Sequence, residues 1–122
     1  MRRQYRLRRS TDFQRVRRDG QFYASPLMVL AFVQNELEHS RFGFVVSKRI
    51  GKAVRRNKIK RRMREAVRQR IPVIKPGFDV ILIARQPIAE ASYQEIERWI
   101  DRLLNKANLV QTVERNRYRV EQ

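Results

Sequence analysis

The sequence predicts an α+β fold with one central sheet and helices packed against it. Apolar runs at 27–33, 42–47 and 79–84 have the length and composition of strands. The stretches 54–70 and 93–107 carry apolar side chains at helical spacing. With a short N-terminal helix, the order is helix, two or three strands, helix, strand, helix, which is typical of an α+β domain.

All 122 residues are assigned to a single domain, which begins with a basic arm over residues 1–9. A short helix is predicted at 11–19, because Thr11 and Gln14 have the spacing of a capping box. Gly20 is suited to end this helix.

The next elements build the sheet. Residues 21–23 are predicted to add an edge strand, and the polar residues 34–40 a turn. Strand 42–47, helix 54–70 and strand 79–84 then form a βαβ unit. If the two strands are adjacent and parallel, the general rule gives a right-handed crossover.

Residues that end or begin secondary structure predict the element boundaries in the C-terminal part of the chain. Pro72 ends the preceding helix, and Pro76-Gly77 marks a turn. Ser92 and Glu95 have capping-box spacing at the start of the last helix. The polar residues 108–122 are predicted to be a flexible tail.

The charge of the chain indicates a polyanionic partner. Lys and Arg total 29 against 12 Asp and Glu, a formal net charge of +17. Such self-repulsion is tolerated when the partner is a polyanion, which favours nucleic acid first and an anionic membrane surface second. Neither a secretory signal nor an apolar run of about 18 residues is recognisable, so a cytoplasmic protein is expected.

The stretch 48–64 is the most basic part of the chain. More than half of its positions are Lys or Arg, and none is acidic. Helical spacing places an apolar set on one side, namely Ile59, Met63, Ala66 and Val67. It places a polar set on the opposite side, namely Asn57, Arg61, Arg64 and Arg68. One face is thus suited to a core and the other to phosphate groups, which guanidinium forks bind well.

The residues of a self-sufficient nuclease are not recognisable. Acidic residues such as Asp12 and Asp19 are scattered and are expected to be solvated surface charge. The chain has no Cys, and its one His, His39, cannot form a His-based metal site, so neither a catalytic residue nor a metal ligand is assigned. The protein is therefore not expected to be a catalyst by itself.

Two stretches of the chain resemble the protein subunit of bacterial ribonuclease P. In that family a Gly-bearing strand leads through Ser-Lys-Lys/Arg and Ile/Val-Gly to Lys-x-x-x-Arg-Asn-Arg-x-Lys-Arg-x-x-Arg. Residues 41–64 carry this pattern, with Lys58 in place of the Arg at the third position of Arg-Asn-Arg. The family's Ala-Arg-x-Pro corresponds to Ala84-Arg-Gln-Pro87, and the resemblance spans 4–107.

The resemblance implies a fold similar to the second domain of ribosomal protein S5, with a left-handed βαβ crossover. It also implies a subunit of the endoribonuclease that matures tRNA 5′ ends. In that enzyme a large RNA carries the active site and its Mg²⁺ ions, while the protein binds no cofactor of its own. The implied partners are ribonuclease P RNA and the 5′ leader of precursor tRNA, with no membrane and no DNA.

The resemblance also assigns residues to these partners. Ribonuclease P RNA is expected at Lys48, Arg49, Lys52, Arg55, Arg56, Asn57, Lys58, Lys60, Arg61, Arg64 and Arg68. The leader cleft, between the first helix and the sheet, is expected to include Phe13, Arg17 and Arg85. Arg17 and Ala31 stand where the family often has aromatic residues. The alternatives are a solvated helix face for the basic residues and an ordinary core position for Phe13.

Three other classes of protein fit part of the sequence. A ribosomal or architectural RNA-binding protein of similar fold would share the charge and strands but not the ordered motif. An independent ribonuclease would need an acidic constellation. A membrane-surface helix would carry Trp, Phe or Leu opposite its charges. Here that side has only Ile59, Met63, Ala66 and Val67, which suit packing on a sheet.

Overall fold

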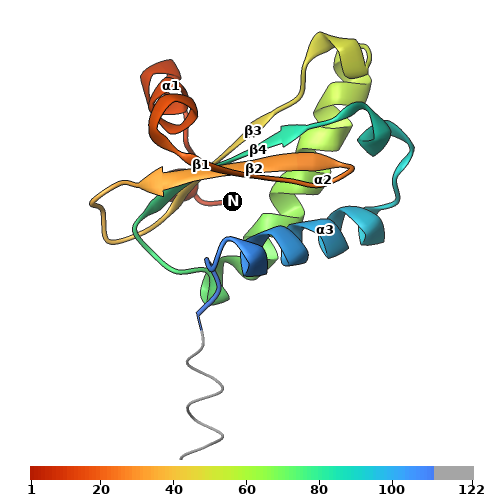
Figure 1. Ribbon diagram of the computed structural model, residues 1–122. Coiled ribbons are helices and arrows are strands. Elements are labelled where there is room, and N and C mark those ends of the chain that lie inside the picture. The colour runs from red at the N-terminus through yellow and green to blue at the C-terminus, as the bar shows by residue number, and fades with distance from the viewer. Residues whose placement is uncertain (112–122) are drawn as a thin grey trace, which may run out of the picture.

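The computed structural model describes residues 1–111, which form one mixed four-stranded sheet with α1 on one face and α2 and α3 on the other (Figure 1). The strands lie in the order β1-β2-β4-β3. They are β1 (Gln21–Ala24), β2 (Met28–Gln34), β3 (Arg41–Val45) and β4 (Phe78–Ala84). The helices are α1 (Ser10–Asp19), α2 (Ala53–Arg70) and α3 (Tyr93–Lys106). Short 3₁₀ turns are η1 (Arg3–Tyr5), η2 (Lys48–Ile50), η3 (Ile71–Val73) and η4 (Gln86–Glu90).

The predicted α+β order is therefore confirmed, including the edge strand β1. The βαβ unit is also present, because β3 and β4 are parallel neighbours with α2 between them in the chain. The hand of this crossover stays a prediction. Strand β3 ends two residues earlier than expected, since the chain leaves the ladder after Val45. Of the predicted tail 108–122, the residues after 111 lie outside the described part.

The N-terminal arm joins the free edge of the sheet. The backbone N–H of Leu7 donates to the carbonyl of Phe42 in β3 at 2.9 Å. Helix α1 then begins at Ser10, with Arg9 at the N-cap and no side-chain cap. The predicted capping by Thr11 is wrong, because Ser10 already has helical geometry and Thr11 lies inside the first turn.

The main core lies between the sheet and the helices α2 and α3. The sheet contributes Leu30, Phe32, Phe42, Val80 and Leu82. The helices contribute Ile59, Met63, Ala66, Val67, Ile96, Ile100, Leu103 and Leu104. The apolar stripe predicted for the basic helix is thus the buried one. Each fully buried Leu, Ile or Met stabilises the fold by ~1.5–3 kcal/mol relative to exposure.

Two local features fix the remaining elements. The capping box of α3 is confirmed: the N–H of Glu95 donates to Ser92 Oγ at 3.1 Å, and the N–H of Ser92 donates to Glu95 Oε1 at 2.9 Å. On the opposite face of the sheet, α1 packs over a smaller cluster. Its buried members are Leu7, Val16, Ala31 and Ile81.

Candidate nucleic-acid interface

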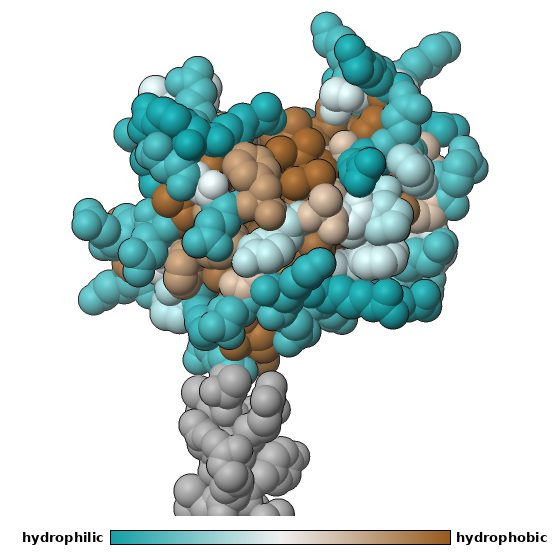
Figure 2. Space-filling view, in the orientation of Figure 1, coloured by the Kyte–Doolittle hydropathy of each residue, from teal (hydrophilic) through white to brown (hydrophobic). Residues whose placement is uncertain are grey.

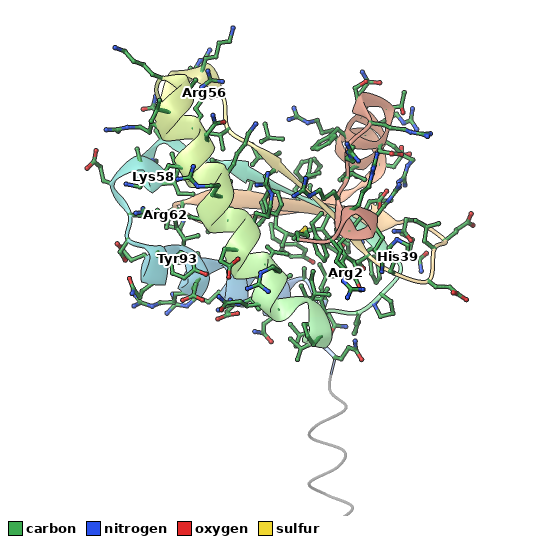
Figure 3. All side chains as sticks on the ribbon, turned by 180° about the vertical axis from the view of Figure 1, so that it is seen from behind. Arg2, His39, Arg56, Lys58, Arg62 and Tyr93 are labelled. Atoms are coloured by element: carbon green, nitrogen blue, oxygen red, sulfur yellow. The ribbon has the colours of Figure 1, made fainter. Side chains whose placement is uncertain are left out.

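The N-terminal half of α2 and the preceding turn η2 present a dense set of cationic side chains, which we call the α2 basic surface (Figure 3). Its members are the uncharged Asn57 and the cations Lys48, Arg49, Lys52, Arg55, Arg56, Lys58, Lys60 and Arg61. All are exposed except Arg56 and Lys60, which are half-buried. Among residues 1–111, the one ion pair of this surface joins Arg55 to Glu90 across 3.8 Å. The remaining positive charge is therefore available to a phosphate backbone.

The start of α2 adds to this positive potential. Lys52 is the N-cap residue and provides no side-chain cap, and the first turn contains no acidic residue. The free N–H groups and the positive end of the helix dipole therefore add to the positive potential around η2 and the first turn of α2. Arg56 folds back over the turn, where its Nε donates to the carbonyl of Gly51 at 3.1 Å.

Two residues predicted for the same row behave differently. Arg68 forms a bidentate ion pair with Glu65: its Nε donates to Oε1 at 2.9 Å and its Nη2 to Oε2 at 2.6 Å. Arg64 is half-buried, and its guanidinium carbon lies 5.8 Å from the centre of the Phe44 ring. Burial, together with the nearby charge of Arg6, lowers the pKa of Arg64. Arg64 and Arg68 therefore lie outside the buried stripe of α2, as expected, but Phe44 and Glu65 already engage their guanidinium groups.

Arg64 belongs instead to a hollow of about 190 Å³ at the outer edge of β3. The hollow lies between the N-terminal arm, α1 and α2, and it is lined by Arg6, Arg8, Phe13, Phe44, Lys60 and Arg64 among others. No acidic side chain is part of this lining. The hollow brings Phe13, expected to contact the leader, beside residues expected to contact ribonuclease P RNA.

Phe13 owes its position to Gly43. A Cβ atom built on Gly43 would come 2.4 Å from Phe13 Cζ, so only glycine lets the ring lie this close to β3. Phe13 remains half-buried, packed on the α1-side cluster but not enclosed by it. It thus contributes to packing and also offers part of its ring to the surface. Arg17, one turn later on α1, is exposed.

An apolar floor extends from α1 across the rest of the same sheet face. Phe22 is 49% exposed, and Val29, Val45 and Ile83 are half-buried. The register of the sheet places these side chains on the face that α1 covers only in part. Figure 2 shows this apolar surface between α1 and the N-terminal end of α2, with hydrophilic residues on both sides. We call it the sheet floor.

The sequence analysis assigned Phe22 to an edge strand but did not predict that its ring would be exposed on the sheet floor. Phe22 pairs with Ala31, so its exposed ring lies on the floor beside Ala31, which is itself buried in the α1-side cluster. Arg85 follows β4 at the far end of the floor, where its Nη1 donates to the carbonyl of Ser25 at 2.8 Å. Phe13, Arg17 and Arg85 therefore border one sheet face, but Arg85 lies at the opposite end from α1.

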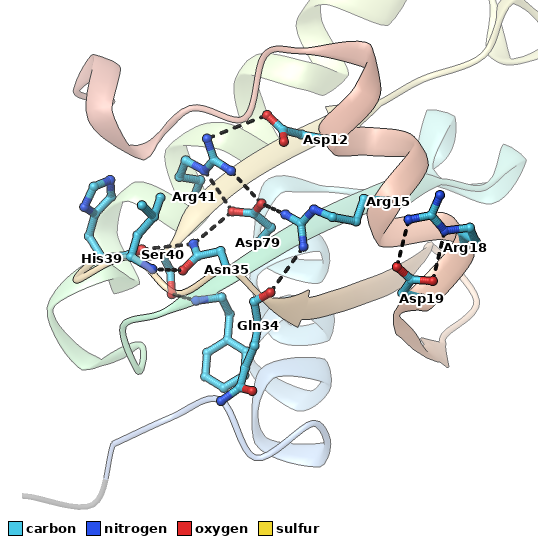
Figure 4. A network of polar contacts seen from close by, with 12 residues as sticks. Asp12, Arg15, Arg18, Asp19, Gln34, Asn35, His39, Ser40, Arg41 and Asp79 are labelled. Atoms are coloured by element: carbon cyan, nitrogen blue, oxygen red, sulfur yellow. Dashed lines mark hydrogen bonds and ion pairs between the residues drawn. The ribbon is translucent and has the colours of Figure 1, made fainter.

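A buried polar network was also missed (Figure 4). Asp79 in β4 is fully buried and accepts two hydrogen bonds from Arg41, at 2.9 and 2.7 Å. Arg15 of α1 donates to the same carboxylate, and Asn35 donates to it at 2.9 Å. Asp12 of α1 lies 3.7 Å from Arg41. The expectation that Asp12 is solvated surface charge is therefore wrong. The hydrogen bonds from Arg41 to Asp79 also raise the pKa of Arg41.

Two further findings concern the described residues alone. Within residues 1–111, no cluster of three or more His, Asp or Glu side chains is placed to hold a metal ion. No helix in the same range combines the length and apolar character needed to cross a membrane.

The mixed sheet, the α2 basic surface and the cation-lined apolar floor together define an α+β protein suited to bind RNA. The family model for ribonuclease P matches residues 1–108. The chain belongs to this family, the protein component of the ribonucleoprotein enzyme that matures tRNA 5′ ends, and its partner is ribonuclease P RNA. This decides against the alternative of a ribosomal or architectural protein without a nuclease role.

Relatives and solved structures agree with the family match. The ribonuclease P protein component of Roseiflexus castenholzii is 46% identical over 112 residues, 91% of this chain and 92% of the relative. The ribonuclease P protein component of Chloroflexus aurantiacus is 41% identical over 111 residues, which are 90% of this chain and 82% of the relative. Among solved structures, the Staphylococcus aureus RNase P protein has a TM-score of 0.82 at 36% identity, covering 88% and 98%. The Thermotoga maritima protein has a TM-score of 0.77 at 34% identity, covering 83% and 96%.

Proposed function

We propose that the α2 basic surface docks on ribonuclease P RNA, while the sheet floor and its borders hold the 5′ leader of precursor tRNA. The observation that carries this proposal is the α2 basic surface, whose cations have a single ion pair within residues 1–111. A protein surface of this kind gains affinity by displacing counterions from a nucleic-acid backbone. The proposal therefore predicts strong salt dependence for RNA docking.

The docking contacts have different expected strengths. Arg61 and Lys58 are exposed on α2 and are free to contact phosphates. Arg68 is already paired with Glu65, so its net contribution is expected to be smaller. Arg64 packs on Phe44 and lies at the hollow beside β3, where it can reach RNA on either side of the sheet edge.

The leader side combines aromatic and cationic groups. Single-stranded RNA is held by stacking on aromatic rings and by cations along its backbone. Phe13 and Phe22 offer exposed ring surface, and Arg17 supplies a free guanidinium. Phe22 lies beside Ala31, so it can provide the stacking surface that Ala31 does not. Arg85, which donates a hydrogen bond to the carbonyl of Ser25, borders the end of the sheet floor that lies away from α1.

In this proposal the RNA binds the Mg²⁺ ions and carries out the hydrolysis. Mg²⁺ is bound through oxygen ligands, chiefly carboxylates, phosphates and water. The two protein surfaces are instead cationic or apolar, so their residues do not fit a Mg²⁺ site. The protein contributes binding and orientation of the substrate. The proposal places the protein in the cytoplasm, which cell fractionation tests.

Reconstitution tests this division of labour. At low Mg²⁺, ribonuclease P RNA is expected to cleave precursor tRNA efficiently only after the purified protein is added, leaving a 5′-phosphate on the tRNA. The variant Arg61→Ala should require more protein for the same rate. The control variant Arg98→Ala removes an exposed cation from α3. It should need no more protein than the unchanged chain to reach the same cleavage rate. Equal behaviour of the two variants would contradict docking through α2.

The same preparation should be tested without RNA. The protein alone is expected to leave precursor tRNA intact, and robust cleavage by RNA-free protein would contradict the proposal. An mRNA substrate belongs in this experiment, because one related solved structure is that of a Staphylococcus aureus RNase P protein mutant with defective mRNA degradation activity. That protein is 34% identical with a TM-score of 0.82, covering 87% of this chain and 90% of its own.

A further inference from the structure

We infer that the network around Asp79 is a positioning device that fixes the rotation of α1 and thereby places Phe13 and Arg17 for the leader. This inference rests on the proposed leader-binding role of the sheet floor. It assigns a function in substrate binding to Arg15 and Asp79, which would not themselves touch RNA.

The network joins α1 to an inner strand of the sheet, at the end where β4 begins. Asp79 lies in β4, an inner strand, and is fully buried. Arg15 spans from α1 to this carboxylate, and its Nη1 also donates to the carbonyl of Gln34 at 3.2 Å. Arg41 of β3 binds Asp79 with two hydrogen bonds and lies 3.7 Å from Asp12 of α1. Two residues of α1 are thus tied to one charged cluster (Figure 4).

Helical geometry links this cluster to the leader side. With the buried Val16 as the reference and a step of about 100° per residue, Asp12 and Arg15 lie at roughly −40° and −100°. Phe13 and Arg17 lie at roughly +60° and +100°. The network therefore holds one side of the helix, while the other side faces the sheet floor. A rotation of α1 that releases Arg15 also moves Phe13 and Arg17.

The apolar packing that also restrains this rotation comes from Val16 and from Phe13 on the small cluster. α1 has ten residues, and only Val16 among them is fully buried. Its N-terminus has no side-chain cap. A helix this short is marginal by itself, so tertiary contacts determine where it lies.

The charged groups are better suited to fix a position than to add stability. Buried ion pairs often contribute little net stability, because desolvation offsets their attraction, but they can select one arrangement. Removal of Arg15 leaves Asp79 paired with Arg41 and bonded to Asn35. The fold should therefore survive the variant Arg15→Gln, while the restraint on α1 is lost.

The position of α1 can be measured directly, because the chain contains no Cys. Spin labels at Gln14→Cys on α1 and Gln94→Cys on α3 would report one distance distribution, since both positions are exposed. Arg15→Gln is expected to broaden or shift this distribution. The matched control is Arg18→Gln, which removes an equal charge from an exposed pair with Asp19 on the same helix. The control should leave the distribution unchanged.

The functional consequence is measured in the reconstituted holoenzyme. Arg15→Gln should weaken binding of precursor tRNA with a long leader by roughly 3- to 30-fold, the range of indirect couplings, with mature tRNA and ribonuclease P RNA affinity nearly unchanged. Arg18→Gln should have a smaller effect. In a background of Phe13→Ala and Arg17→Ala, Arg15→Gln should cause little further loss, because it acts through those residues. The folded variant Asp79→Asn should likewise lose affinity for precursor tRNA with a long leader and keep its affinity for mature tRNA and ribonuclease P RNA.

The outcomes separate the inference from the proposed function. An unchanged distance distribution in Arg15→Gln, equal leader losses for Arg15→Gln and Arg18→Gln, or full additivity with the double variant would each overturn the positioning role. If Phe13→Ala and Arg17→Ala themselves leave leader binding unchanged, the leader site on the sheet floor is wrong. The distance measurement then still decides whether the network fixes α1.

Discussion

The ring of Phe13 lies directly against Gly43, closer than any residue with a Cβ atom would permit. A Cβ on Gly43 would come 2.4 Å from Cζ and 2.6 Å from Cε1 of the ring. The two residues come from different elements, α1 and β3, and are brought together at the hollow that Arg64 also lines. The missing side chain of Gly43 therefore determines where an aromatic surface is offered to RNA.

The variant Gly43→Ala is expected to displace the Phe13 ring and to destabilise the protein by about 1–3 kcal/mol, the usual cost of an overpacked site. Urea denaturation measures this change. Adding Phe13→Ala removes the clash, so the double variant should be more stable than the sum of the single effects predicts. Simple additivity would show that the ring and the new methyl group do not collide.

Leader binding should depend on the exposed ring of Phe22 and on the half-buried ring of Phe13. Phe13→Ala and Phe22→Ala are each expected to weaken binding of precursor tRNA with a long leader by roughly 1–3 kcal/mol, the value of one stacked base. Mature tRNA should be nearly unaffected. Phe22 is 49% exposed, so its replacement should leave the melting temperature almost unchanged, whereas Phe13→Ala should lower it. Equal losses for mature and precursor tRNA would remove the leader from this face.

Arg17→Ala should also weaken leader binding, but by loss of a backbone contact. Its effect is expected to shrink as salt rises, because screening weakens exposed charge interactions. The contribution of Phe13 should persist under the same conditions. Measuring the affinity for precursor tRNA as a function of leader length, at two salt concentrations, distinguishes the contribution of Arg17 from that of Phe13. A loss of affinity in Arg17→Ala that does not depend on salt would contradict a phosphate contact.

Docking on ribonuclease P RNA should respond to Arg61→Ala without a change in folding. Arg61 is exposed, so its loss is expected to reduce the salt slope of binding by about one unit per phosphate contact. Ile59→Asp on the buried side should instead destabilise the fold by roughly 3 kcal/mol or more. Ile59 is only 4% exposed. An unchanged salt slope in Arg61→Ala would mean that another face docks.

Glu65 is expected to respond to acid through Arg68. The hydrogen bond from Arg68, and then that from Gln69, lowers the pKa of Glu65 from its usual 4.5 to about 2. Because the folded-state pKa lies below the unfolded value, the stabilisation is present above pH 4.5 and is lost as the pH falls toward 2. The pair is exposed, so the effect is small. NMR titration of Glu65 should show its pKa rising in Arg68→Ala.

The same pair bears on RNA docking. Glu65→Gln frees the guanidinium of Arg68, so affinity for ribonuclease P RNA at low salt should increase and the salt slope should steepen by up to about one unit. Arg68→Ala in the native background should cost less affinity than Arg61→Ala. If the two Arg variants are equal, the pair with Glu65 opens on docking.

The sequence alone determined the order of elements and the two sides of α2. Apolar spacing is a local property, so Ile59, Met63, Ala66 and Val67 could be placed in the core without knowledge of the partner elements. The capping box at Ser92 and Glu95 is equally local. The motif in 41–64 indicated the family, which the comparisons confirm.

Tertiary structure alone decided how the candidate RNA-binding residues are grouped. Phe13 meets Gly43, Arg64 packs on Phe44, and Phe22 lies beside Ala31 only because of strand register and of how the helices pack on the sheet. The burial of Asp79 depends likewise on Arg15 and Arg41, which are 64 and 38 residues away in sequence. Such pairings arise from long-range strand and helix packing, and no periodicity within a single element encodes them.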